Sequence, residues 1–187
     1  AEITTAYGGI FDLLENFNVP AHEMDELPTV TYENTMNLHE GNETISMHYF
    51  GQGHTDGDSI IKFNKANVVH TGDSFILYGL PFIDITNGGS IKGFIKILTH
   101  IAEICDEDTI IIPGHGGLTN VEGVKKMRDD LQLYYDTTIS GHKKGLTIEQ
   151  ISSSINIDLG KTNGFGDPLT VKHNFIRSIL LENNIIK

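Results

Sequence analysis

Three short loop-forming segments of the sequence carry side chains that could bind a metal ion. Each follows a short extended apolar run, and they are GHTDGD (53–58), HTGD (70–73) and PGHG (113–116). Imidazole and carboxylate groups are ligands that zinc, iron and manganese accept, and one carboxylate can bridge two ions. His54, Asp73 and His115 are therefore our candidate ligands. The neighbouring glycines allow the sharp turns that a site at strand ends requires.

Three further residues near these segments allow more than one interpretation. Thr55 and Asp58 lie beside His54 and are candidates for the surrounding groups that fix a metal-bound imidazole ring. Asp58 is equally suited to capping a turn. His70 precedes Asp73 on an expected strand, which favours a hydrogen-bonded core or rim histidine over a metal ligand.

The segments around these loops predict strands. Short β-branched runs bounded by turn residues indicate strands at 59–63, 67–70 and 109–113. MNLHE and ETISMHYF flank Gly41 and Asn42, which predicts a hairpin with a tight turn.

Four helices are expected. Three of them begin at a capping side chain, which is Ser90, Thr147 or, for the segment 171–184, Thr170, and the other begins near Asn120. Apolar side chains at helical spacing follow Ser90 and Asn120 and are expected to face the core. Strands followed by helices make the predicted fold a layered α/β one.

Length and charge limit the partners of the chain. Its 187 residues fit one domain. With 13 Lys and Arg against 25 Asp and Glu, the net charge of −12 disfavours nucleic acid and anionic membranes as partners. Cys105, the single cysteine, excludes an intrachain disulfide and is expected to be buried. The sequence shows no signal peptide or membrane span, and leaves a cytoplasmic or periplasmic location open.

The order GHTDGDSIIKF, NVVHTGDSF and TIIIPGHG resembles the second half of a metallo-β-lactamase superfamily hydrolase. The similarity continues through PFIDITNGGSIKGFI and NGFGDPLTVKHNFIRSIL, so it covers nearly the whole chain. The resemblance implies the C-terminal portion of an αββα sandwich, with a helical extension over 145–187. It also implies that His54 belongs to the first metal site, that Asp73 bridges both metals and that His115 belongs to the second site.

One departure from the family pattern is as informative as the match. The signature HxHxDH is absent, and AEITTAYGGI resembles the sequence that follows it. We therefore expect residues 1–187 to form a single domain that is truncated at its N-terminus. Such a portion would expose an apolar sheet face, so we expect a homo-oligomer or association with the missing N-terminal half.

The resemblance implies a metallohydrolase acting on a small molecule with an ester, lactone, thioester or amide-type bond. It would use two zinc ions, with iron or manganese as alternatives, and a metal-bound hydroxide that the catalytic residue Asp73 orients. Two other functions stay open: a fragment or pseudo-enzyme with weak or no metal binding, and an iron-dependent oxidoreductase of the same fold. We expect the parent protein to be an enzyme and the isolated chain to have little activity.

Overall fold

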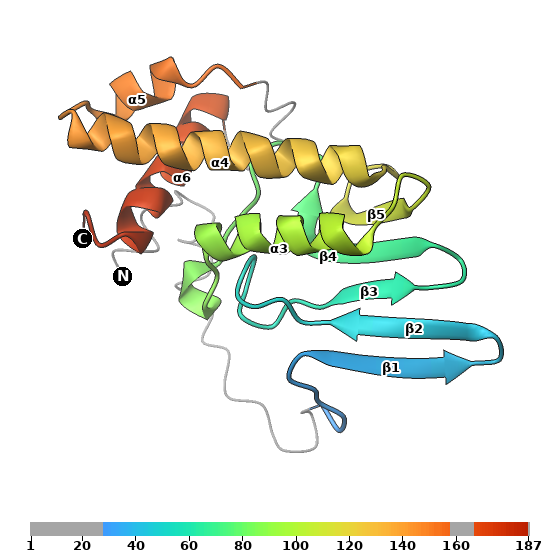
Figure 1. Ribbon diagram of the computed structural model, residues 1–187. Helices are drawn as coiled ribbons and strands as arrows, with labels where there is room; N and C mark the ends of the chain where they lie inside the picture. The colour runs from blue at the N-terminus through green and yellow to red at the C-terminus, as the bar shows by residue number, and fades with distance from the viewer. Residues whose placement is uncertain (1–27, 158–166, 187) are drawn as a thin grey trace.

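A five-stranded sheet is the frame of the fold in the computed structural model, which describes residues 28–157 and 167–186 (Figure 1). The strands are β1 (Thr35–Glu40), β2 (Glu43–His48), β3 (Ile60–Phe63), β4 (Val68–Ile76) and β5 (Ile110–His115). The helices are the 3-10 turn η2 (Ile85–Asn87), α3 (Ile91–Ile104), α4 (Val121–Lys143), α5 (Ile148–Ser154) and α6 (Pro168–Glu182).

The sheet follows the chain order β1-β2-β3-β4-β5. The first three pairings are antiparallel, and the expected hairpin is confirmed by the pair Glu40 and Glu43, with Gly41 at φ 58° in the turn between them. β4 and β5 are parallel and are joined by η2 and α3. Parallel strands end on the same side, so the loops after β4 and β5 are neighbours.

β4 is longer than the expected strand at 67–70. It continues to Ile76 because pairing with β5 resumes after irregularities between His70 and Gly72 and between Gly72 and Ile76. Such bulges bend a strand and redirect its side chains. Asp73 lies within this irregular part of β4.

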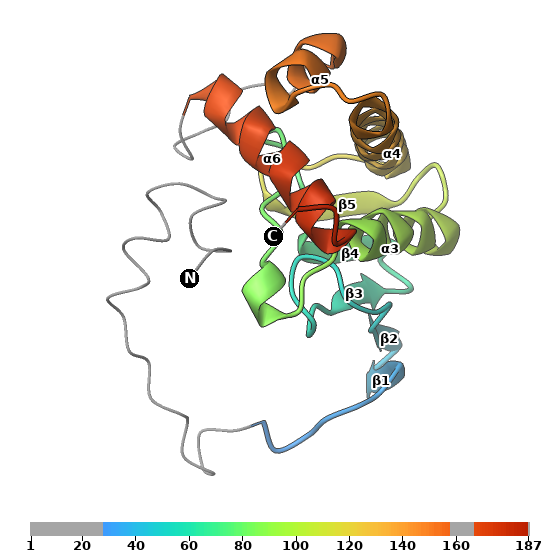
Figure 2. The same cartoon turned by 90° about the vertical axis from the view of Figure 1, so that its left-hand side faces the viewer.

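Helices α3 and α4 cover one face of the sheet (Figures 1 and 2). Ser90 caps α3, as predicted, by accepting a hydrogen bond from the backbone N–H of Gly93. Asn120 caps α4 in the same way at Glu122 and Gly123. The predicted apolar stripe of α3 is buried and consists of Ile91, Phe94, Ile95, Leu98 and Ile101.

The two C-terminal helices begin at different kinds of cap. Thr147 caps α5 with a complete capping box to Gln150, as predicted. The prediction that Thr170 caps the last helix is wrong: Asp167 accepts hydrogen bonds from the N–H groups of Leu169 and Thr170. Pro168 explains the earlier start, because a proline at the first helical position lacks only an N–H that would have no partner there.

One hydrophobic core joins the sheet to the four α-helices of the described residues. It includes Ile60 and Val69 from the sheet, Ile151 from α5 and Ile179 from α6. The helices within the expected extension 145–187 therefore pack into the same core as the sheet. Residues 158–166, between α5 and α6, lie outside the described residues.

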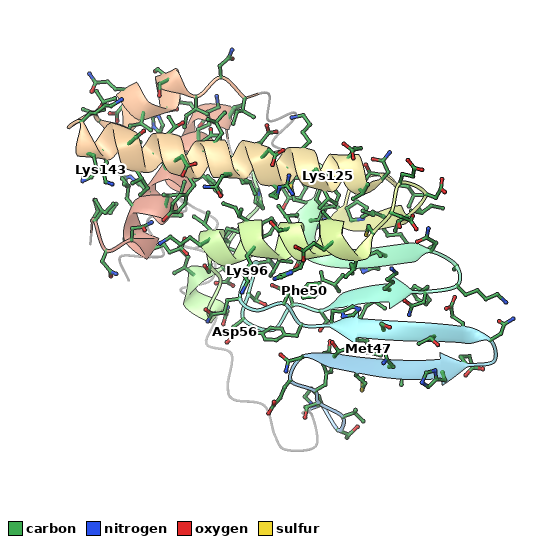
Figure 3. The ribbon with its side chains drawn as sticks, in the orientation of Figure 1. Met47, Phe50, Asp56, Lys96, Lys125 and Lys143 are labelled. Carbon is green, nitrogen blue, oxygen red and sulfur yellow. The ribbon has the colours of Figure 1, made fainter. Side chains whose placement is uncertain are left out.

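The opposite face of the sheet is also apolar. Strand pairing places on it Met36, Leu38, Ile45, Met47, Ile61, Phe63, Val68, Ile110 and Ile112. In the described part of the chain none of these side chains is fully buried or belongs to the core, and Leu38 and Ile110 are 47% and 45% exposed. Figure 3 labels Met47 on β2 within this set.

Candidate metal centre

Asp73 lies between the two candidate histidines. Its Oδ2 is 3.7 Å from Nε2 of His54, and its Oδ1 is 3.4 Å from Nε2 of His115. The structure thus brings together the three ligands predicted from the sequence, with one carboxylate oxygen directed to each imidazole. Their assignment as metal ligands stays a prediction.

The two separations fit ligands that share an ion. A good hydrogen bond between nitrogen and oxygen is about 2.9 Å long, so these pairs are too far apart for strong direct bonds. Zinc holds nitrogen and oxygen ligands at about 2.0–2.2 Å, and two ligands at a tetrahedral angle are then about 3.4 Å apart. The donor types and their spacing therefore suit one ion between each histidine and Asp73.

The number of donors is smaller than a metal site needs. Within residues 28–157 and 167–186, no three His, Cys, Asp or Glu side chains form a group that could hold one ion. Each of the two positions has two donors, one imidazole and one oxygen of Asp73, whereas zinc sites usually have three or four protein ligands.

The ring of His54 is fixed by the backbone carbonyl oxygen of Phe82, which lies 2.8 Å from Nδ1. A carbonyl oxygen can only accept, so Nδ1 carries a proton, and the neutral form of the ring is the tautomer whose Nε2 holds the lone pair that a metal requires. The Phe82 ring also meets the imidazole edge to face, with centroids 5.9 Å apart. Only 18% of the His54 side chain is exposed.

Thr55 and Asp58 hold the loop that carries His54. Asp58 accepts hydrogen bonds from the N–H group of Thr55 at 2.7 Å and from its hydroxyl at 2.9 Å. This loop also contacts η2, because the N–H group of Asp56 donates to the carbonyl oxygen of Asn87 at 3.0 Å. Figure 3 labels Asp56 in this loop.

Asp73 depends on a glycine in the neighbouring strand. A Cβ atom at Gly114 would overlap Oδ1 of Asp73 and would also come within 2.6 Å of the carbonyl carbon of Gly72. Gly72 itself has φ 50°, a backbone conformation that favours glycine. The glycines of HTGD and PGHG therefore let the carboxylate lie against β5.

His115 is the more open of the two histidines, with 54% of its side chain exposed. The ring of Tyr78 packs against it edge to face, with centroids 5.3 Å apart. Burial of the Tyr78 hydroxyl, together with the negative charge of Asp73, raises the pKa of Tyr78 above its usual value. A neutral phenol is therefore held beside the carboxylate.

Two further residues that the sequence analysis named, His70 and Cys105, lie outside this centre. His70 is on β4, as expected, but is exposed, and its Nδ1 accepts a hydrogen bond from Gly72 N–H. Cys105 is half-buried at the end of α3. Sequence reasoning missed the Phe82 carbonyl, since any residue type would supply one. The close approach of Gly114 to Asp73 did have a signal in the sequence, which is the glycine next to His115 in the PGHG segment.

Sequence comparison finds no relative: no model of a known protein family and no curated protein matches the chain. Solved structures do match. The sec-alkylsulfatase Pisa1 from Pseudomonas sp. has a TM-score of 0.58 at 14% identity, over 80% of this chain and 26% of that chain. A double mutant of Pisa1 has a TM-score of 0.60 at 13% identity, over 83% and 27% of the two chains.

A metallo-beta-lactamase from Pontibacter korlensis has a TM-score of 0.49 at 15% identity, over 56% of this chain and 49% of that chain. The chain thus spans about half of the length of that protein and about a quarter of Pisa1. In the described residues, no helix is long and apolar enough to cross a membrane.

Proposed function

We propose that this chain, which has part of the metallo-β-lactamase fold, supplies the His54, Asp73 and His115 ligands of a binuclear metallohydrolase. The observation that carries this proposal is the position of Asp73, with one carboxylate oxygen directed to each histidine Nε2.

In this proposal His54 and Asp73 would hold one ion, and His115 and Asp73 would hold the other. Zinc suits this donor set, and iron or manganese would accept it as well. When bound, two such ions activate water for attack and polarise the bond to be hydrolysed. The remaining ligands of each ion would come from groups outside the described residues.

The chain's own residues have separate roles. The bond from His54 Nδ1 to the Phe82 carbonyl selects the neutral tautomer that presents the lone pair of Nε2, and it keeps the ring immobile. Asp73 keeps the two positions at a fixed separation. Tyr78, whose raised pKa keeps its hydroxyl protonated, can donate a hydrogen bond to an oxygen of the substrate. Esters, lactones, thioesters and amides all present such an oxygen, and we propose a small molecule of this kind as substrate.

A catalytically incomplete chain is the second candidate. The observation that favours it is that the described residues provide only two donors to each position. In this case the parent protein is the enzyme, and the isolated chain binds metal weakly and turns over little substrate.

The apolar face of the sheet opposite the helices also bears on whether the chain is incomplete. We propose that in a solution of this chain alone a second copy covers the face that contains Leu38, Met47 and Ile110. Five strands form a patch of about 24 Å by 16 Å, which is small against the roughly 800 Å² that each partner gives to a standard interface. Association is therefore expected to depend on concentration. Because each chain has a net charge of −12, added salt is expected to strengthen it.

Metal content tests the proposed centre. We would measure bound zinc, iron and manganese by plasma mass spectrometry after equilibration with each metal and gel filtration. We expect bound metal that is lost in His54→Ala and Asp73→Ala and retained in His70→Ala, a control that removes an imidazole close to the centre. A wild-type chain that retains no metal would support the incomplete-chain alternative, and retention in all variants would refute the assigned ligands. Iron as the retained metal would favour an oxidoreductase.

A further inference from the structure

The end of α6 reaches the first turn of α3. The carboxylate of Glu182 accepts hydrogen bonds from the Ser90 hydroxyl at 2.6 Å, from Ile91 N–H at 3.1 Å and from Lys92 N–H at 3.4 Å. The first N–H groups of a helix have no partner within the helix, and a negative charge is favourable there. Glu182 thus anchors the start of α3 from a position 90 residues later in the chain.

A second contact strengthens the same anchor. The carbonyl oxygen of the Asn183 side chain accepts hydrogen bonds from the Lys92 ammonium group at 2.8 Å and from the Tyr135 hydroxyl at 2.7 Å. The Lys92 ammonium also lies 5.5 Å from the centre of the Tyr135 ring. Helices α3, α4 and α6 therefore meet at one cluster of polar contacts.

The start of α3 also supports the loop that carries His54. The N–H group of Ser90 donates to the carbonyl oxygen of Gly53 at 2.9 Å. The N–H group of Asp84 donates to the carbonyl oxygen of His54 at 2.8 Å. The two segments are in close contact, because a Cβ atom at Gly89 would come within 2.6 Å of the same His54 oxygen.

Ser90 links the two sets of contacts. Its hydroxyl donates to the Glu182 carboxylate, and its N–H group donates to the carbonyl oxygen of Gly53. Through Gly89 the backbone leads back to Asp84, whose N–H group donates to the carbonyl oxygen of His54. Loss of the Glu182 carboxylate would free the Ser90 hydroxyl and two N–H groups of α3. The loop that carries His54 would then be the first segment to shift. Within the described residues, His115 on β5 makes no hydrogen bond to this cluster.

We infer that Glu182 is a positioning residue for His54. Its carboxylate holds the imidazole of His54, but not that of His115, in the position for metal binding. The metal part of this inference rests on the proposed function. The positioning part is independent of it, because His54 is held by Glu182 through Ser90 in the metal-free chain.

The test compares imidazole NMR resonances of Glu182→Ala and Glu182→Gln with those of Glu103→Ala, which removes a carboxylate near the other end of α3. We expect the His54 ring signals to move and its Nδ1 proton to exchange faster in Glu182→Ala, with His115 unchanged. Glu182→Gln keeps one acceptor oxygen and is expected to show a smaller change, which preserves the test if the alanine variant unfolds.

Zinc titration of the same variants then separates the two proposals. A loss of affinity of about 10-fold in Glu182→Ala, as for other groups that support metal ligands, together with the His54 shift would support both. A His54 shift in Glu182→Ala, together with a wild-type chain that binds no zinc, would support positioning and defeat the proposed function. Unmoved His54 signals in folded Glu182 variants, or equal shifts of His54 and His115, would overturn the positioning role.

Discussion

His54 Nδ1 donates to the backbone carbonyl oxygen of Phe82 over 2.8 Å, although the two residues are 28 positions apart. The ring tautomer and orientation of a candidate metal ligand are therefore set by the path of the chain after β4 and not by a neighbouring acidic side chain. A substitution of the Phe82 side chain leaves this acceptor in place, whereas a displacement of the backbone around it removes the acceptor.

Gly114→Ala is expected to damage the centre, because its Cβ atom would overlap the Asp73 carboxylate. We expect metal affinity to fall by about 10–100-fold and stability to fall by about 1–3 kcal/mol, measured by calorimetric titration and denaturant unfolding. Gly117→Ala is the matched control, since a Cβ atom there meets nothing within 4 Å. Equal effects of the two variants would contradict a specific role for Gly114.

Tyr134→Phe is expected to stabilise the protein. Among the described residues the buried Tyr134 hydroxyl has no hydrogen-bond partner, and its removal relieves a cost of about 1–3 kcal/mol. The neighbouring hydroxyl of Tyr135 donates to Asn183, so Tyr135→Phe is expected to destabilise by about 0.5–1.5 kcal/mol. Urea unfolding of both variants checks this contrast, and a destabilised Tyr134→Phe would indicate a bound water at the hydroxyl.

Alkaline pH provides a second readout of Tyr134. Burial raises its pKa, so above the unfolded value of about 10 the folded state keeps a proton that the unfolded state has lost. Stability therefore declines as pH rises above about 10. We expect a shallower decline in Tyr134→Phe, with the remainder due in part to Tyr78, whose pKa burial also raises. Unfolding free energies of the wild type and of Tyr134→Phe, measured from pH 8 to 11, give the two slopes of stability against pH.

Asp167→Ala is expected to lower the melting temperature more than Thr170→Ala, because the Asp167 carboxylate caps α6. Hydrogen bonds from the Thr170 side chain and backbone lower the pKa of Asp167. Its stabilising contribution is therefore present above the unfolded value of about 3.9 and is lost as pH falls through the lowered folded pKa. The difference between wild type and Asp167→Ala should shrink as pH falls below the unfolded value of about 3.9. A larger loss in Thr170→Ala than in Asp167→Ala at neutral pH would restore Thr170 as the cap.

Leu38→Lys is expected to reduce self-association of the chain. Leu38 lies on the uncovered apolar face, whereas the adjacent and exposed Asn37 points to the other face of β1. Light scattering across a range of concentrations should show a lower mass for Leu38→Lys and no change for Asn37→Lys, although both variants add one positive charge. A wild-type chain that is monomeric at all concentrations would remove the second copy as the cover of this face.

The elements that depend on local pattern could be predicted from the sequence. Ser90 and Thr147 are predicted caps, and both act as such. The helix predicted to begin near Asn120 does begin there, followed by its apolar stripe. The convergence of His54, Asp73 and His115 was predicted from loop position and resemblance together. The part that the sequence did not reveal depends on tertiary contacts: the Phe82 carbonyl is independent of residue type, and Glu182 is far in sequence from the helix that it anchors.

The core that runs without a break from Ile60 in β3 to Ile179 in α6 makes the sheet and the C-terminal helices a single cooperative unit. Their slowest amide protons are expected to exchange with solvent through the same global opening, and not through separate local ones. A protease cut or a deletion that removes α6 would then loosen the sheet that carries Asp73 and His115. The centre is therefore expected to lose its order in the same transition as the helices, with no state in which the sheet alone persists.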